Sequence, residues 1–171
     1  MDLAEFIADV PDFPIEGVLF KDITPLLSEP KAFKEAVDLM VTEFEDKEID
    51  QVVAIESRGF IFGAPIAYQL GCGFVLVRKP EKLPRETVSV EYSLEYGTNT
   101  LEMHADSIRP GDRVLLVDDL LATGGSARAA VDLIEKLGGQ VVGIAFLIEL
   151  AFLQGREKLE DYDIFSIITF D

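Results

Sequence analysis

The chain has 171 residues, and 49% of them are hydrophobic, so it can bury a sizeable core and we expect one domain over residues 1–171. Its formal net charge of −17 argues against nucleic acid or an anionic membrane surface as the main partner. No apolar run reaches the ~18–20 residues needed to cross a bilayer, and the opening residues lack the basic start of a signal peptide.

Short apolar runs alternate with helical patterns along most of the chain. In chain order we expect a short helix at 3–9, an extended segment at 17–27, a helix at 30–45, a strand at 51–55, a helix at 60–70, strands at 73–77 and 114–117, a helix at 125–137, and strands at 141–150 and 163–169. Ser28 is the expected N-cap of the helix at 30–45. Strands that alternate with helices predict an α/β fold, with a parallel sheet covered on both faces.

Residues 78–105 interrupt this alternation. They contain Pro80 and Pro84, followed by two runs with partial polar–apolar alternation, TVSVEYSLEYG and TNTLEMHA. Because this alternation is too imperfect for a fully buried strand pair, we interpret the segment as a projecting, flexible loop and hairpin inserted into the α/β core.

Two adjacent acids, Asp118 and Asp119, follow the apolar run at 114–117. Ligands bind at the carboxyl ends of the strands in an open parallel sheet, and carboxylates suit sugar hydroxyls or a hydrated cation. The acids are followed by a loop that leads into a helix, where glycines let the backbone approach an anion and free amides attract it. The loop residues are Ala122, Thr123, Gly124, Gly125 and Ser126. The stretch predicts a sugar-phosphate site, since an ordinary strand–turn–helix would leave two buried acids without partners.

The segment VLLVDDLLATGGS resembles the 5-phosphoribosyl-1-diphosphate (PRPP) signature of the type I phosphoribosyltransferases. Three further segments resemble the adenine phosphoribosyltransferases of that family, in the same order: VPDFPIEGVLFKDITPLL, IESRGFIFGAPIA and VRKPEKLPRETVSVEYSLEYGTNTLEMHADSI. The PRPP signature is shared by many relatives, whereas the DFP opening and YSLEYG are far more specific. The resemblance covers essentially the whole chain. It implies a central, mostly parallel sheet flanked by helices, with an N-terminal hood over about 1–28 and the flexible loop and hairpin over about 78–105.

The reaction implied by the resemblance joins adenine to PRPP and gives AMP and pyrophosphate, with Mg2+ held mainly through PRPP and water. Guanine or hypoxanthine is the alternative base, and a non-catalytic PRPP-sensing regulator of the same fold is the alternative class of protein. Such a regulator needs a basic face or an added helix-turn-helix domain, and the sequence has neither. The family shares its basic loop between subunits, so we expect a homodimer. The single cysteine, Cys72, fits a reducing compartment, and we expect a cytoplasmic protein.

The resemblance also implies a role for each part of the PRPP site. The loop from Ala122 to Ser126 would hold the 5′-phosphate. Asp118 and Asp119 would hold the ribose hydroxyls, and their charge would favour a sugar that becomes cationic in the transition state.

The pyrophosphate would lie against the segment ESRGF and the cations that follow the next strand. In ESRGF, the resemblance assigns Ser57, Arg58 and Gly59, and it implies a strained or cis non-proline peptide bond, which we place at Glu56–Ser57. The cationic residues are Arg78, Lys79, Lys82 and Arg85. Glu81 stands where relatives often carry glycine, so the sequence leaves the role of Lys82 open.

Adenine would lie under the N-terminal hood, in an apolar slot with a few backbone hydrogen bonds. The resemblance assigns this slot to Leu19, Phe20, Lys21 and Leu150. Glu95 and Tyr96, on the mobile loop, would close over the site. Glu95 is the candidate for proton transfer with the purine, which makes the predicted catalytic set Glu95, Arg58, Asp118 and Asp119.

Overall fold

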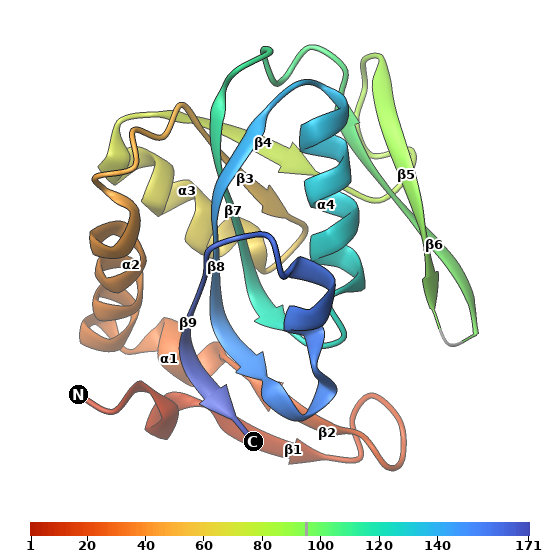
Figure 1. Cartoon of the computed structure of the whole chain (residues 1–171). Coiled ribbons are helices and arrows are strands. Elements are labelled where there is room, and N and C mark those ends of the chain that lie inside the picture. Colours follow the sequence, from red (N-terminus) through yellow and green to blue (C-terminus); the bar gives the residue numbers. More distant parts are fainter. Residues whose placement is uncertain (95) are drawn as a thin grey trace.

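The central sheet of this computed structural model, which describes residues 1–94 and 96–171, has five strands in the order β4-β3-β7-β8-β9 (Figure 1). Every pairing between neighbouring strands of this sheet is parallel. The strands are β3 (Gln51–Ile55), β4 (Gly73–Val77), β7 (Arg113–Leu121), β8 (Gln140–Leu150) and β9 (Ile164–Phe170). These are the five apolar runs that the sequence predicts, so the α/β fold with a parallel sheet is confirmed.

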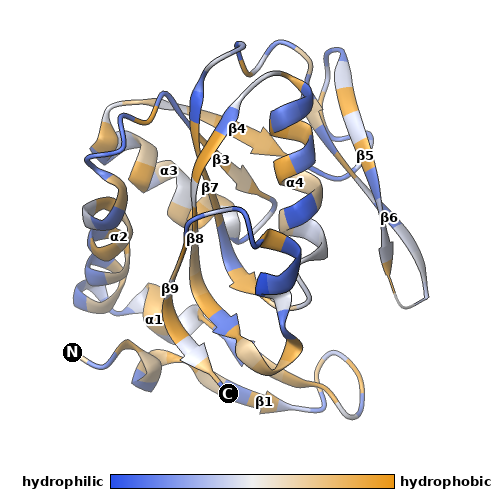
Figure 2. Ribbon diagram, in the orientation of Figure 1, coloured by the Kyte–Doolittle hydropathy of each residue, from blue (hydrophilic) through white to orange (hydrophobic). Residues whose placement is uncertain are grey.

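Helices cover both faces of the sheet. On one face, α2 (Pro30–Phe44) and α3 (Gly59–Leu70) pack over a cluster of buried residues that includes Phe44 and Phe62. On the other face, α4 (Gly125–Lys136) packs over a second cluster that includes Phe146. Figure 2 shows the apolar residues gathered in the central strands and on the sheet-facing sides of the helices. None of the helices among the described residues is both long and apolar enough to cross a membrane.

The first 28 residues form short elements along the carboxyl edge of the sheet, as the hood prediction requires. They are η1 (Leu3–Phe6), β1 (Ala8–Pro11), β2 (Leu19–Asp22) and α1 (Thr24–Ser28), and β1 pairs with β2 in antiparallel register. The helix predicted over 3–9 is therefore only one turn long, because the residues after it enter the strand pair. Ser28 ends α1 and does not cap α2, whose N-cap is Glu29, with a side chain that accepts the Lys31 N–H.

The hairpin predicted within 78–105 is present as β5 (Thr87–Leu94) and β6 (Gly97–His104). One bridge, between Arg78 and Glu102, connects β6 to the end of β4. The inner part of the hairpin packs against α4, where Leu101 and Met103 are buried, and the rest projects away from the sheet (Figure 1). The partial alternation in the sequence thus reflects a strand pair with one partly buried face.

Phe146→Ala tests the packing of the second core cluster. Phe146 is fully buried on β8, so the substitution leaves a cavity and should lower the free energy of unfolding by about 3–5 kcal/mol. Phe152→Ala is the matched control, because Phe152 is 61% exposed and its removal should change stability by no more than ~0.5 kcal/mol. Urea denaturation of both variants measures the difference, and equal losses would contradict this account of the core.

Candidate active site

A cavity of about 410 Å³ opens at the carboxyl ends of β3 and β7, where ligands bind in open parallel sheets. Its wall is built from several segments that are distant in the sequence. The lining residues include Glu56, Ser57, Arg58, Lys79, Tyr92, Asp118, Asp119, Ala122, Thr123, Gly124, Gly125 and Ser126. The structure therefore brings together most of the residues predicted to bind PRPP.

The loop between β7 and α4 forms one end of this cavity. Gly124 is the N-cap residue of α4 and has a left-handed backbone, with φ of +88°, which favours glycine. As a glycine, Gly124 has no side chain that could cap this helix end. The backbone amides at the start of α4 are therefore available to an anion, and the helix dipole favours negative charge there.

The adjacent acids form the floor of the cavity. They lie inside β7 and not beyond it, because pairing with β8 continues through Leu121. Asp118 is 8% exposed and Asp119 is 6% exposed. The Asp119 N–H donates to Asp118 Oδ1 at 2.8 Å, and Asp119 Oδ2 lies 2.7 Å from Arg58 Nε. Burial, together with the neighbouring Asp119 charge, raises the pKa of Asp118 well above its usual value.

Arg58 stands between this cavity and a second one of about 450 Å³ under the hood. Its guanidinium carbon lies 5.3 Å from the centre of the Phe20 ring. The second cavity is mostly apolar, which suits a flat, neutral base. Its lining residues are Val10, Phe13, Phe20, Asp22, Ile23, Thr24 and Arg58.

Phe20 faces this second cavity, whereas its neighbours Leu19 and Lys21 do not line it. Successive side chains of a strand point to opposite sides, so Phe20 in β2 is turned toward the cavity and its neighbours away. Leu19 is 51% exposed, and Lys21 Nζ bonds Asp9 Oδ1 at 2.6 Å. Leu150, at the end of β8, is half-buried against the first core cluster and lines neither cavity.

The segment ESRGF links the floor of the first cavity to α3. The Glu56–Ser57 peptide bond is cis, as the resemblance implied. Gly59 begins α3 next to the acid pair. A Cβ on this glycine would lie only 3.0 Å from Asp118 Oδ1. Glu56 Oε1 accepts the Lys79 N–H at 2.9 Å and Arg78 Nε at 3.0 Å. Burial alone would raise the pKa of Glu56, but these two donors more than offset it and hold the pKa below its usual value.

Two further predicted residues, Lys82 and Tyr96, do not line the cavity. Lys82 is exposed on the connection to β5, and Tyr96 is 88% exposed at the tip of the hairpin. Glu95, the predicted proton-transfer residue, lies outside the described residues. The roles of these three side chains stay predictions.

The sequence patterns do not point to several residues of the second cavity, namely Val10, Phe13, Asp22, Ile23 and Thr24. Asp22 carries the one local signal, because aspartate two residues before a threonine can form a turn in which its side chain accepts from the backbone. Here Asp22 Oδ1 accepts the Thr24 N–H at 2.9 Å. Val10 and Phe13 meet Phe20 only through the pairing of β1 with β2.

Comparison with known proteins agrees with this geometry. The phosphoribosyl transferase domain family matches residues 22–171. The chain belongs to the phosphoribosyltransferase family. Among its relatives, an adenine phosphoribosyltransferase of Halothermothrix orenii is 56% identical over 98% of this chain and 99% of its own.

Solved phosphoribosyltransferase structures have the same type I fold. The adenine phosphoribosyltransferase of Thermoanaerobacter pseudethanolicus is 54% identical, with a TM-score of 0.95 over 98% of each chain. The Saccharomyces cerevisiae enzyme, crystallised with adenine and an imino-altritol bisphosphate, is 41% identical, with a TM-score of 0.92 over 96% of each chain. The predicted type I phosphoribosyltransferase fold is confirmed.

Asp118→Asn tests whether the acid pair is maintained at a cost to stability. A carboxyl whose pKa is raised on folding stabilises the protein fully only below its unfolded pKa, and this contribution is lost as the pH rises through the folded pKa. Asparagine removes the buried charge and keeps an acceptor for the Asp119 N–H. The variant should therefore melt higher than the parent, with a gain that grows as the pH rises from about 4.

A difference of one pKa unit corresponds to ~1.4 kcal/mol, or a change of about 3–6 °C in Tm for a chain of this size. Calorimetry between pH 4 and 8 measures the gain. Asp112→Asn is a suitable control, because Asp112 lies on the loop before β7, away from the cavity. A variant that melts lower than the parent at every pH would show that Asp118 stabilises the fold.

Proposed function

We propose that this protein transfers the 5-phosphoribosyl group of PRPP to adenine and releases pyrophosphate, forming AMP for purine salvage. The observation that carries the proposal is the pair of cavities that meet at Arg58, one polar with an open helix N-terminus and two acids, the other apolar. A phosphorylated sugar fits the first cavity and a flat base the second. The reacting C1′ atom would then lie near Arg58. The full-length similarity to adenine phosphoribosyltransferases supports the same assignment.

Each wall of the first cavity has a distinct task in this reaction. The loop from Ala122 to Ser126 binds the 5′-phosphate through backbone amides and hydroxyls. Asp118 and Asp119 accept hydrogen bonds from the ribose hydroxyls, and their charge favours the oxocarbenium-like sugar of the transition state more than the neutral ground state.

Pyrophosphate departs toward the segment that contains Ser57 and Arg58, next to Lys79, whose N–H donates to Glu56 of the same segment. In the free protein Arg58 is paired with Asp119. A negatively charged diphosphate competes for this guanidinium, which can form two parallel hydrogen bonds with phosphate oxygens. Glu95 is the proposed partner for proton transfer with the purine.

We further propose that Mg2+ enters with PRPP, coordinated by diphosphate oxygens and water. Within residues 1–94 and 96–171, no three His, Cys, Asp or Glu side chains lie close enough together to hold a metal ion. Asp118 and Asp119 would then meet the hydrated ion, and oxygen ligands of this kind suit Mg2+. The ion would neutralise charge on the leaving pyrophosphate.

The assembly and the compartment are also proposals. A homodimer would let one subunit present its exposed basic residues, such as Lys82 and Arg85, to its partner's site. Cys72 is a free thiol whose pKa is raised by burial, and a free thiol of this kind is compatible with the reducing cytoplasm.

Adenine should be the preferred base. The purine-by-purine measurement uses PRPP and Mg2+ with adenine, hypoxanthine and guanine, and it follows pyrophosphate release. We expect kcat/KM for adenine to exceed the other values by at least ~10³-fold, because a site with fixed hydrogen-bonding groups leaves those groups unpaired against the wrong base. Comparable kcat/KM values for guanine would overturn the adenine assignment.

The double variant Asp118→Asn with Asp119→Asn should fold and bind PRPP but lose most of its turnover. Groups that stabilise transition-state charge contribute roughly 3–4 kcal/mol each, so kcat should fall by at least ~10²-fold. Glu43→Gln with Glu45→Gln, near the end of α2, removes the same charge away from the cavities and should leave kcat unchanged. Near-normal turnover of the Asp variant would show that the acids are structural.

A further inference from the structure

The segment that follows β8 packs directly behind the loop 122–126. This segment contains η3 (Gly155–Leu159) and continues to Tyr162, and we call residues 155–162 the brace. A Cβ on Gly124 would lie 2.6 Å from Gly155 O, and a Cβ on Gly155 would overlap Ala122 O and lie 2.8 Å from Leu121 Cδ1. The two backbones therefore touch with no room for side chains between them.

Lys158 adds a directed contact to this packing. Its Nζ donates to Thr123 O at 2.9 Å, from the side of the loop that faces the brace. The C=O and N–H of a trans peptide point in opposite directions, so holding Thr123 O also fixes the direction of the Gly124 N–H. The ammonium also places a positive charge beside the loop in a chain whose net charge is −17.

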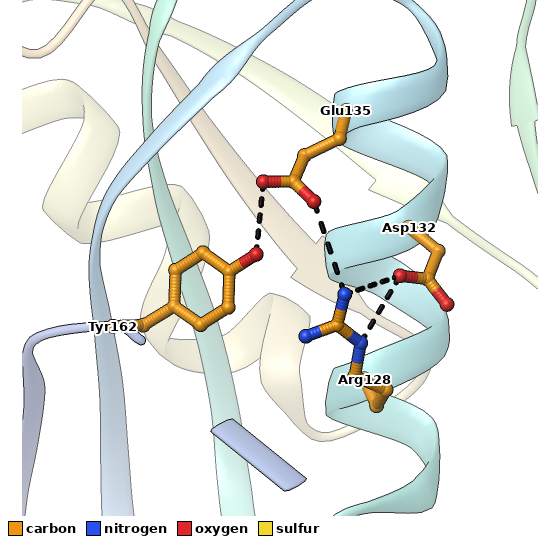
Figure 3. Close-up of polar contacts among 4 residues, drawn as sticks. All are labelled: Arg128, Asp132, Glu135 and Tyr162. Atoms are coloured by element: carbon orange, nitrogen blue, oxygen red, sulfur yellow. Dashed lines mark hydrogen bonds and ion pairs between the residues drawn. The ribbon is translucent and has the colours of Figure 1, made fainter. Parts of the chain in front are cut away.

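The far end of the brace is attached to α4. Tyr162 O–H donates to Glu135 Oε2 at 2.8 Å, and Arg128 Nη2 lies 3.9 Å from the other oxygen of Glu135 (Figure 3). Arg128 also bonds Asp132 Oδ1 through Nε and Nη2, at 3.0 and 2.7 Å. Arg128 lies in the first turn of α4, and its N–H donates to Gly124 O at 2.9 Å. The brace thus contacts both the loop and the start of the helix that follows.

A third attachment joins the brace to the sheet. Arg156 Nε bonds Glu149 Oε2 at 2.7 Å, and Ser166 Oγ donates to Glu149 Oε1 at 2.8 Å. Glu149 is only 5% exposed at the end of β8. Burial alone would raise the pKa of Glu149, but the bonds from Arg156 and Ser166 lower it by more than burial raises it. The carboxylate therefore remains charged and bonded. The brace is therefore held at several points that bind no substrate themselves.

We propose that Lys158 is a positioning residue for the 5′-phosphate and that the brace keeps the loop 122–126 in its anion-binding shape before substrate arrives. The inference rests on the proposed function, since the 5′-phosphate is the group that this loop would receive. A loop that is already ordered does not lose conformational entropy on binding, so its anion affinity is higher. Lys158 acts through the Thr123 carbonyl and need not touch the ligand.

Lys158→Met removes the ammonium and keeps a long, flexible side chain. Isothermal titration calorimetry should show Kd for AMP and for ribose 5-phosphate rising about tenfold, the range expected for one lost hydrogen bond to a charged group. Kd for pyrophosphate should stay unchanged, because pyrophosphate binds at the other end of the cavity. In the transfer reaction, KM for PRPP should rise by a similar factor, while kcat and KM for adenine stay within about twofold.

Two variants distinguish a positioning role of Lys158 from a general effect of its positive charge on anion binding. Lys136→Met makes the same change in net charge at an exposed position of α4, where Nζ lies 3.4 Å from Ser89 O, and it should bind all ligands as the parent does. Lys158→Arg retains a cationic donor and should restore most of the AMP affinity. Equal losses for AMP and pyrophosphate in Lys158→Met, or equal effects of Lys136→Met, would overturn the positioning role.

Gly155→Ala tests the packing without changing charge. Its Cβ would push against Ala122 O, so the variant should lose affinity for AMP and ribose 5-phosphate and retain affinity for pyrophosphate. A lower Tm with unchanged AMP binding would show that the brace serves only stability. The parent protein separates a failure of the positioning role from a failure of the proposed function. If it binds AMP and transfers the phosphoribosyl group while Lys158→Met behaves identically, only this inference fails, whereas a parent that does neither overturns the proposed function.

Discussion

The ion pair between Arg58 and Asp119 is the contact that connects the parts of the molecule forming the site. It joins Arg58, the N-cap residue of α3, to Asp119 in the buried part of β7, with 2.7 Å between Arg58 Nε and Asp119 Oδ2. The same guanidinium lies against Phe20, so the hood also depends on its position. Without this cation, two carboxylates would be buried side by side with no charge to balance them, a situation that costs several kcal/mol. Arg58 therefore lines both cavities, one on the side of Asp119 and the other under the hood.

The site also has to attract anions to a strongly acidic protein. The long-range field of a chain with net charge −17 repels PRPP, so the attraction must come from groups within a few ångströms of the ligand. Backbone amides at the start of α4 meet this need without adding charged side chains to the cavity. Arg58 and Lys79 supply full positive charges at the other end. Lys158 reaches the same loop from behind, through a carbonyl.

The acids at the end of β7 illustrate how function and stability oppose each other in one element. Burial raises the pKa of Asp118, which means that its charge is expensive in the free protein. In the proposed reaction, the same low exposure would make the carboxylate effective toward a developing positive charge on ribose, since water does not screen it. We attribute the placement of two acids in the core of a parallel sheet to this catalytic requirement.

Local sequence patterns were sufficient to predict much of the fold. The strands at 51–55 and 73–77 occur with the predicted bounds, because a buried parallel strand needs an uninterrupted apolar run and the flanking residues here end it. The loop 122–126 was also recognisable, since glycines and hydroxyls before a helix are a local device for binding anions. The short strands β1 and β2 were harder to predict from the sequence, because each depends on pairing with the other more than on its own four residues.

By itself, the sequence determined the order of strands and helices, the acid pair and the glycine-rich loop 122–126, since each of these is encoded within a few consecutive residues. Only the tertiary structure decided which distant residues meet. It pairs Arg58 with Asp119, turns Phe20 and not Leu19 or Lys21 toward the apolar cavity, and sets Lys158 on the carbonyl of Thr123. The physical reason is that these contacts join segments tens of residues apart. Their geometry comes from the packing of the sheet, the helices and the hood together, and no local pattern records it.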